Sequence, residues 1–172
     1  VQGSAFRLKN GQLLTCYHVI SYARMIKVFK HGSPLVKYEC AVAYQDDIYD
    51  IAILKFKKDV EPVHFLELSQ DVAKQGDKLT IAGFPQYNKD ASSYIFDAKV
   101  AGFREYHGQR LIVIDKTLVI GNSGGPALNK ENKVIGICRT GAKSFEVRHD
   151  FIDYCVQPIN VLNESIIPLK IF

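Results

Sequence analysis

A serine lies inside a glycine-rich turn in the second half of the chain, in the segment Gly121-Asn122-Ser123-Gly124-Gly125-Pro126. Glycines on both sides of a serine let the backbone approach a substrate closely and leave the hydroxyl accessible, which suits a nucleophile. A plain β-turn is the alternative. A phosphate-binding P-loop is not indicated, because its Gly-Lys-Ser/Thr sequence is absent. The segment therefore predicts a nucleophilic serine if the chain also supplies a base.

Two residues further upstream could activate this hydroxyl. His18 follows the apolar run Leu14-Thr15-Cys16-Tyr17, so an imidazole at the end of a strand is expected as general base. Asp50 begins another apolar strand, where a buried carboxylate could hold the imidazole in one tautomer and orientation. An ordinary half-buried histidine and a strand-capping aspartate are the alternatives, and Asp46 and Asp47 are rival acids.

The elements that must position these residues are almost all strands. Runs rich in Val, Ile, Tyr and Phe recur along the chain, and Asn10-Gly11 between two of them is a strong hairpin signal. Helical signals are limited to a short turn after His18 and a helix from Pro158. The expected strands span residues 5–8, 13–15, 25–29, 35–44, 51–56, 78–84, 94–103, 111–114, 134–138 and 151–156.

The strands fall into two clusters separated by the polar stretch 67–77. We therefore predict an all-β fold of two six-stranded antiparallel barrels within one domain, 1–172. The expected boundaries are an N-terminal barrel over 1–68, a linker over 69–77, a C-terminal barrel over 78–157, and a C-terminal segment over 158–172 that could form a short helix.

Composition is that of a globular domain: of 172 residues, 47% are hydrophobic and 23% are charged, which excludes disorder and fibrous repeats. The formal net charge of +4 comes from scattered basic residues, so no nucleic-acid partner is predicted. No membrane span is expected either, because no apolar stretch approaches about 18 residues.

Four cysteines and five histidines show no metal-ligand spacing, so neither a metal nor another cofactor is predicted. The cysteines allow three disulfide connectivities, and free buried thiols inside strands are the favoured interpretation.

Taken together, the order His18, Asp50, Ser123 and the local sequences around these residues resemble the chymotrypsin-fold (trypsin-like) serine peptidases, in particular the HtrA-like bacterial-type branch. The resemblance extends from Gly3 to about Asn160. The segments that carry it are 3–6, 14–19, 50–54, Asp115, 121–126 and 134–137.

The resemblance implies a chymotrypsin-like double barrel with the active site between the barrels, and a catalytic triad of His18, Asp50 and Ser123. It implies an oxyanion hole from the N–H groups of Gly121 and Ser123, with Asn122 shaping the turn between them. It also implies a protein or peptide substrate bound as an extended strand. The expected substrate-binding residues are Thr117, Leu118, Ile137, Cys138, Arg139, Thr140 and Gly141.

Thr117 and Leu118, at the expected base of the specificity pocket, are uncharged, so small or medium aliphatic side chains are expected before the scissile bond rather than Arg or Lys. An acidic preference through Arg139 is the rival. No PDZ module is expected after Asn160. A narrow-specificity viral-type processing protease and a non-cleaving binding module with a peptidase fold remain alternative functions, and an oligomer or a regulatory partner is possible.

Overall fold

A computed structural model describes residues 2–33, 35–61, 64–86, 92–139 and 155–164 of the chain. Strands dominate these residues, as the sequence predicts, and the two helices have four residues each. The first half contains β1 (Phe6–Arg7), β2 (Leu13–Thr15), α1 (Tyr17–Ile20), β3 (Ile26–Phe29), β4 (Lys37–Asp46) and β5 (Ile51–Phe56). The second half contains β6 (Lys78–Gly83), β7 (Tyr94–Tyr106), β8 (Gln109–Ile114), β9 (Pro126–Leu128), β10 (Val134–Arg139), β11 (Cys155–Pro158) and α2 (Val161–Glu164).

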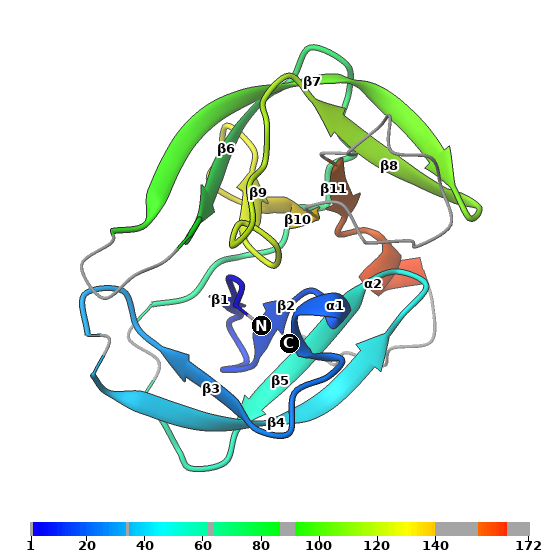
Figure 1. Ribbon diagram of the computed structural model, residues 1–172. Helices are drawn as coiled ribbons and strands as arrows, with labels where there is room; N and C mark the ends of the chain where they lie inside the picture. Colours follow the sequence, from blue (N-terminus) through cyan, green and yellow to red (C-terminus); the bar gives the residue numbers. More distant parts are fainter. Residues whose placement is uncertain (1, 34, 62–63, 87–91, 140–154, 165–172) are drawn as a thin grey trace.

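The N-terminal half forms one curled antiparallel sheet with the strand order β1-β2-β5-β4-β3 (Figure 1). The Asn10-Gly11 pair makes the expected hairpin between β1 and β2. Gly11 takes a φ of 83° there, and its N–H donates to the Leu8 carbonyl at 2.9 Å. Where two six-stranded barrels were expected, this half has five strands among the described residues and an open, half-barrel form.

The C-terminal half is a closed barrel with the order β10-β11-β8-β7-β6-β9, and its six strands are confirmed. Closure removes the unpaired strand edges that an open sheet would expose. The barrel is filled by apolar side chains such as Leu79, Ile81, Val100 and Ile112. The sequence did not predict β9, because a three-residue strand that begins with proline carries little of the strand signal.

The two sheets share a core. One cluster joins Leu14 and Ile53 of the first sheet to Val134 and Ile137 of the barrel and to Ile159 beyond it. The polar stretch between the sheets also packs on the barrel: Ser69 N–H donates to the Val134 carbonyl and Val134 N–H donates to Glu67, both at 2.8 Å. The strands that meet at this boundary, β1 and β2 below and β9 and β10 above, face each other in Figure 1.

Two local expectations differ from the structure, and a third is largely untested. β2 ends at Thr15, so His18 lies inside α1 rather than at a strand end. Pro158 closes β11, and α2 begins only at Val161. The strand expected over 151–156 lies mostly outside the described residues, which begin again at 155 with β11. Neither described helix is long and apolar enough to cross a membrane.

Candidate active site

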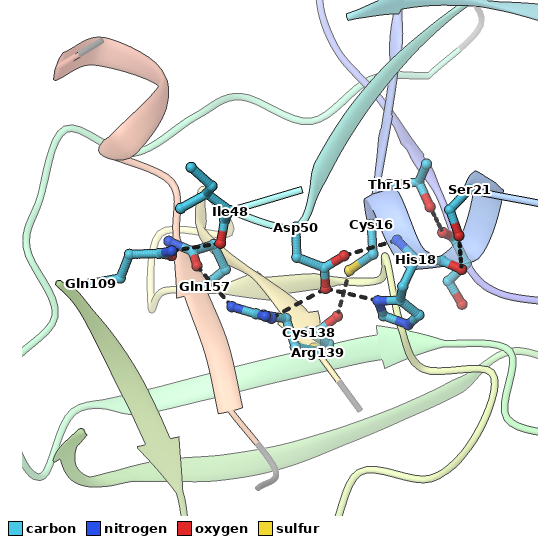
Figure 2. Close-up of polar contacts among 11 residues, drawn as sticks. Thr15, Cys16, His18, Ser21, Ile48, Asp50, Gln109, Cys138, Arg139 and Gln157 are labelled. Carbon is cyan, nitrogen blue, oxygen red and sulfur yellow. Dashed lines mark hydrogen bonds and ion pairs between the residues drawn. The ribbon is translucent and has the colours of Figure 1, made fainter. Parts of the chain in front are cut away.

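His18 and Asp50 are joined by two hydrogen bonds. The imidazole Nδ1 lies 2.7 Å from Asp50 Oδ2, and the backbone N–H of His18 donates to Asp50 Oδ1 at 2.9 Å (Figure 2). Because a carboxylate can only accept hydrogen bonds, Nδ1 carries a proton, and in the neutral imidazole Nε2 then keeps a lone pair. This is the tautomer that a general base needs.

The sheet register explains why these two residues meet. Thr15 at the end of β2 faces Ala52 near the start of β5, so the residues after Thr15 lie beside those before Ala52. The Tyr17 N–H extends this pairing by donating to the Asp50 carbonyl at 3.2 Å. Asp50 has a φ of 54°, a left-handed conformation that aspartate tolerates better than most residues, and it is 4% exposed.

The rival acids serve elsewhere. Asp46 accepts hydrogen bonds from the Tyr44 hydroxyl and the Tyr49 backbone N–H, which fixes the turn between β4 and β5. Asp47 in the same turn is exposed. Of the three candidate carboxylates, the structure therefore places Asp50 on the imidazole.

Ser123 lies in a turn that is held by hydrogen bonds on both sides. Asn122 N–H donates to the Val119 carbonyl at 3.0 Å, and Gly125 N–H donates to the Asn122 carbonyl at 2.9 Å. Ser4 N–H reaches the Ser123 carbonyl at 2.8 Å. Both groups of the Asn122 backbone are therefore engaged within the turn. The serine itself is 3% exposed.

Two glycines make this turn possible. Gly121 has a φ of 104°, and a Cβ there would lie 2.8 Å from Pro85 Cα. Gly124 has a φ of 86°, and a Cβ there would collide with the Ser4 carbonyl oxygen and with Thr15 Oγ1. Larger residues would therefore strain the backbone at both positions, and at position 124 they would also push the turn away from Ser4 and Thr15 of the N-terminal half.

Shared contacts bring the serine turn to the histidine. The Cys138 carbonyl accepts from Gly124 N–H at 3.0 Å and from Cys16 Sγ at 3.3 Å, so the residue after Ser123 and a residue two before His18 use one acceptor. Ser4 also links the two sheets, because its carbonyl accepts from Thr15 Oγ1 at 2.7 Å and its Oγ donates to the Gly121 carbonyl at 2.7 Å.

The side chain of Arg139 occupies an unexpected place. Its Nε lies 3.2 Å from Asp50 Oδ2, and its Nη1 donates to Gln157 Oε1 at 3.3 Å (Figure 2). Sequence reasoning assigned Arg139 to the substrate and missed this ion pair. The sequence offers only the apolar run 134–138 before Arg139, which indicates a buried strand, and a buried arginine requires a counter-charge. Which acid supplies it depends on tertiary structure.

The other expected substrate-binding residues lie in different environments. Thr117 is exposed, whereas the side chains of Leu118, Ile137 and Cys138 are buried in the apolar cores. Thr140 and Gly141 lie outside the described residues. Ile137 pairs with strands on both sides, and Cys138 N–H donates to the Gly125 carbonyl at 2.9 Å. Along β10, backbone groups on the β9 side are therefore occupied up to Cys138.

Cys16 lies close to the His18–Asp50 pair. Atoms of Cys16, His18 and Asp50 that could bind a metal ion lie within 4.8 Å of one another. The chemistry does not favour a cation. Burial raises the pKa of Cys16 well above its ordinary value, so the thiol stays protonated. The guanidinium of Arg139 already balances the carboxylate. All four cysteines are free and buried, as favoured from the sequence, and burial raises the pKa of Cys138 to about 12.

Comparison with known proteins identifies relatives across most of the chain. The family model of the trypsin-like peptidase domain matches residues 3–137. A probable periplasmic serine endoprotease, DegP-like, of Buchnera aphidicola is 32% identical over 159 residues, covering 90% of this chain and 33% of that protein. The human serine protease HTRA4 is 30% identical over 142 residues, covering 78% and 29%. The chain thus spans about a third of the length of these curated relatives.

Solved structures share the fold. The active form of the Rv3671c protease from Mycobacterium tuberculosis superposes with a TM-score of 0.75 at 18% identity, covering 98% of this chain and 76% of that one. A serine endoprotease from Yersinia pestis superposes with a TM-score of 0.73 at 20% identity, covering 94% and 54%. The chymotrypsin-like fold that the sequence predicted is confirmed by these likenesses.

Proposed function

The chain belongs to the trypsin-like peptidase family, with relatives among the DegP and HtrA proteases, and we propose that it is a serine endopeptidase. The observation that carries the proposal is the doubly hydrogen-bonded His18–Asp50 pair beside a glycine-bounded serine turn. Ser123 is the nucleophile, His18 the general base and Asp50 the residue that orients the imidazole.

In the proposed reaction, the Ser123 hydroxyl attacks the carbonyl carbon of a peptide bond while its proton passes to His18 Nε2. The imidazolium is stabilised by Asp50 and then gives this proton to the departing amine, which leaves an acyl-enzyme. Water, deprotonated by the same imidazole, attacks the acyl-enzyme, and the carboxylic acid product leaves with Ser123 restored.

Stabilisation of the oxyanion is assigned to the N–H groups of Gly121 and Ser123. The Gly121 carbonyl is tied to Ser4 Oγ, which leaves the turn little freedom to rotate. Asn122 N–H is bonded to Val119, so it contributes shape rather than a donor. Loss of one such donor typically costs about 10²–10³ in turnover.

The substrate is proposed to add as an extended strand beside the C-terminal end of β10, within the expected segment Ile137 to Gly141, because the β9 side of β10 is occupied up to Cys138. The Arg139 guanidinium is buried and forms an ion pair with Asp50. It is therefore not placed to bind an acidic side chain of the substrate, which weakens the case for an acidic preference. We retain small or medium aliphatic residues before the scissile bond as the proposal, and a peptide-library cleavage profile tests it. A profile dominated by Glu, or by Arg and Lys, would contradict it.

A fluorophosphonate probe tests the reaction class directly. We expect the probe to label wild type and to leave Ser123→Ala unlabelled, with both proteins equally folded by circular dichroism. Absence of labelling in folded wild type would support the alternative of a non-cleaving binding module. Cleavage of many unrelated denatured proteins would oppose the narrow role of a viral-type processing protease.

A further inference from the structure

Arg139 contacts the carboxylate that orients the imidazole, and we propose that it is a positioning residue that weakens the hold of Asp50 on a protonated His18, so that activity extends toward acidic pH. The inference rests on the proposed function, because it treats His18 as the base of the reaction.

The contact geometry makes the two side chains competitors. Asp50 Oδ2 receives His18 Nδ1 at 2.7 Å and Arg139 Nε at 3.2 Å, so one oxygen serves both (Figure 2). The side chains of Asp50 and Arg139 are 5% and 8% exposed, and water screens this interaction little. The positive guanidinium offsets part of the negative charge on this oxygen, so the oxygen attracts a proton on the imidazole less strongly.

Charge balance gives the direction of the effect. Asp50 and Arg139 together carry no net charge, so a proton added to His18 leaves one uncompensated positive charge beside a buried pair. Burial raises the pKa values of the neighbouring thiols, which stay neutral and add no compensating charge. The other titratable groups of the described residues around this cluster include Cys16 beside α1, Cys138 on β10, Cys155 on β11, and Tyr106 and Arg104 on β7.

A second anchor holds the guanidinium in this place. Nη1 of Arg139 donates to the side-chain oxygen of Gln157, which is 1% exposed on β11, and the Tyr106 ring centroid lies 5.9 Å from Cζ. A lysine offers a single nitrogen and cannot span both Asp50 and Gln157. The two contacts together therefore require arginine. A lysine keeps the charge without both contacts, so Arg139→Lys separates the effect of the contacts from the effect of the charge.

The test measures the rate of fluorophosphonate labelling between pH 4.5 and 8. In Arg139→Gln we expect the acidic limb of the profile to move up by about one pH unit, which is about a tenfold loss of rate on that limb. Arg139→Lys is expected to move it less. Arg110→Gln is the matched control, because it removes an equal charge from an exposed residue stacked on Phe103. A uniform loss at all pH values in folded Arg139→Gln would overturn the proposal.

A second readout does not need activity. In the Ser123→Ala background, the proton between His18 Nδ1 and Asp50 gives a downfield ¹H NMR resonance, and we expect Arg139→Gln to move it further downfield as the shared oxygen is released. An unmoved resonance would overturn the inference. If wild type is never labelled, the proposed function fails while this measurement still decides the role of Arg139. If Arg139→Gln does not fold, Gln157→Leu removes the distal anchor and should move the resonance in the same direction.

Discussion

Asp50 and Arg139 form a buried ion pair whose two members depend on each other. In Asp50→Asn we expect catalysis to fall by about 10⁴, because the imidazole loses the partner that fixes its tautomer. We also expect the free energy of unfolding to fall by roughly 3–5 kcal/mol, since the Arg139 guanidinium is left buried without a counter-charge. Urea unfolding and kcat/KM measure the two effects.

The double variant Asp50→Asn/Arg139→Gln separates the effect on stability from the effect on catalysis. It should recover part of the stability, because no buried charge remains unpaired, while activity stays lost. A single Asp50→Asn variant as stable as wild type would show that the ion pair is not desolvated as the structure has it.

Ser4 shows how a residue far from the Ser123 turn in sequence supports that turn. Its hydroxyl donates to the Gly121 carbonyl at 2.7 Å and accepts from Phe84 N–H at 2.9 Å, and the residue is 4% exposed. Ser4→Ala leaves both backbone groups without this partner, so we expect a loss of about 1–3 kcal/mol in the free energy of unfolding. Labelling by fluorophosphonate should slow as well. Ser21→Ala is the control, because among the described residues its hydroxyl makes a single long bond, to the His18 carbonyl at 3.4 Å.

At the scale of elements, the serine turn depends on Gly124. In Gly124→Ala the new methyl meets the Ser4 carbonyl and Thr15 Oγ1 while φ remains at 86°, so we expect loss of labelling and a fall of at least about 2 kcal/mol in the free energy of unfolding. Gly102→Ala on β7 is the matched control, because a Cβ there meets nothing within 4 Å. Equal labelling of both variants would contradict the assigned role of the turn.

Most strands could be predicted from the sequence because the run of Val, Ile, Tyr and Phe is long enough to specify them, as in β5 and β7. The short elements could not. β9 has three residues, and α1 places His18 by a single helical turn that follows a strand without any capping side chain. His18, Asp50 and Ser123 were predicted from their order and neighbours. The ion pair of Arg139 with Asp50 could not be predicted, because nothing local distinguishes an arginine that faces a substrate from one that turns inward.

At the scale of the whole molecule, the buried thiols make the free energy of unfolding depend on pH in the alkaline range. Burial raises the pKa of Cys138 from 9.0 to about 12, so above pH 9 the unfolded chain loses this proton while the folded chain keeps it. Stability contributed by the neutral thiol is therefore present below pH 9 and is lost as the pH rises from about 9 to about 12.

Urea unfolding at pH 8 and pH 10 measures this linkage. We expect the difference in free energy of unfolding between wild type and Cys138→Ala to shrink by about 1 kcal/mol at the higher pH. Val134→Ala, a truncation in the same strand without a titratable group, should show a difference that does not change with pH. A pH-independent difference for Cys138→Ala would contradict the linkage.

The hydrogen bond from Ser4 to Gly121 spans 117 positions of the chain, and the bond from Cys16 to Cys138 spans 122. Contacts of such separation form late in folding, because the loop between them must close before they stabilise anything. During synthesis the histidine and the aspartate leave the ribosome long before the serine turn and the carbonyl that supports it. In the proposed mechanism a nascent chain therefore carries the base without the nucleophile, and the proposed peptidase site is complete only when the last strands of the barrel have been made.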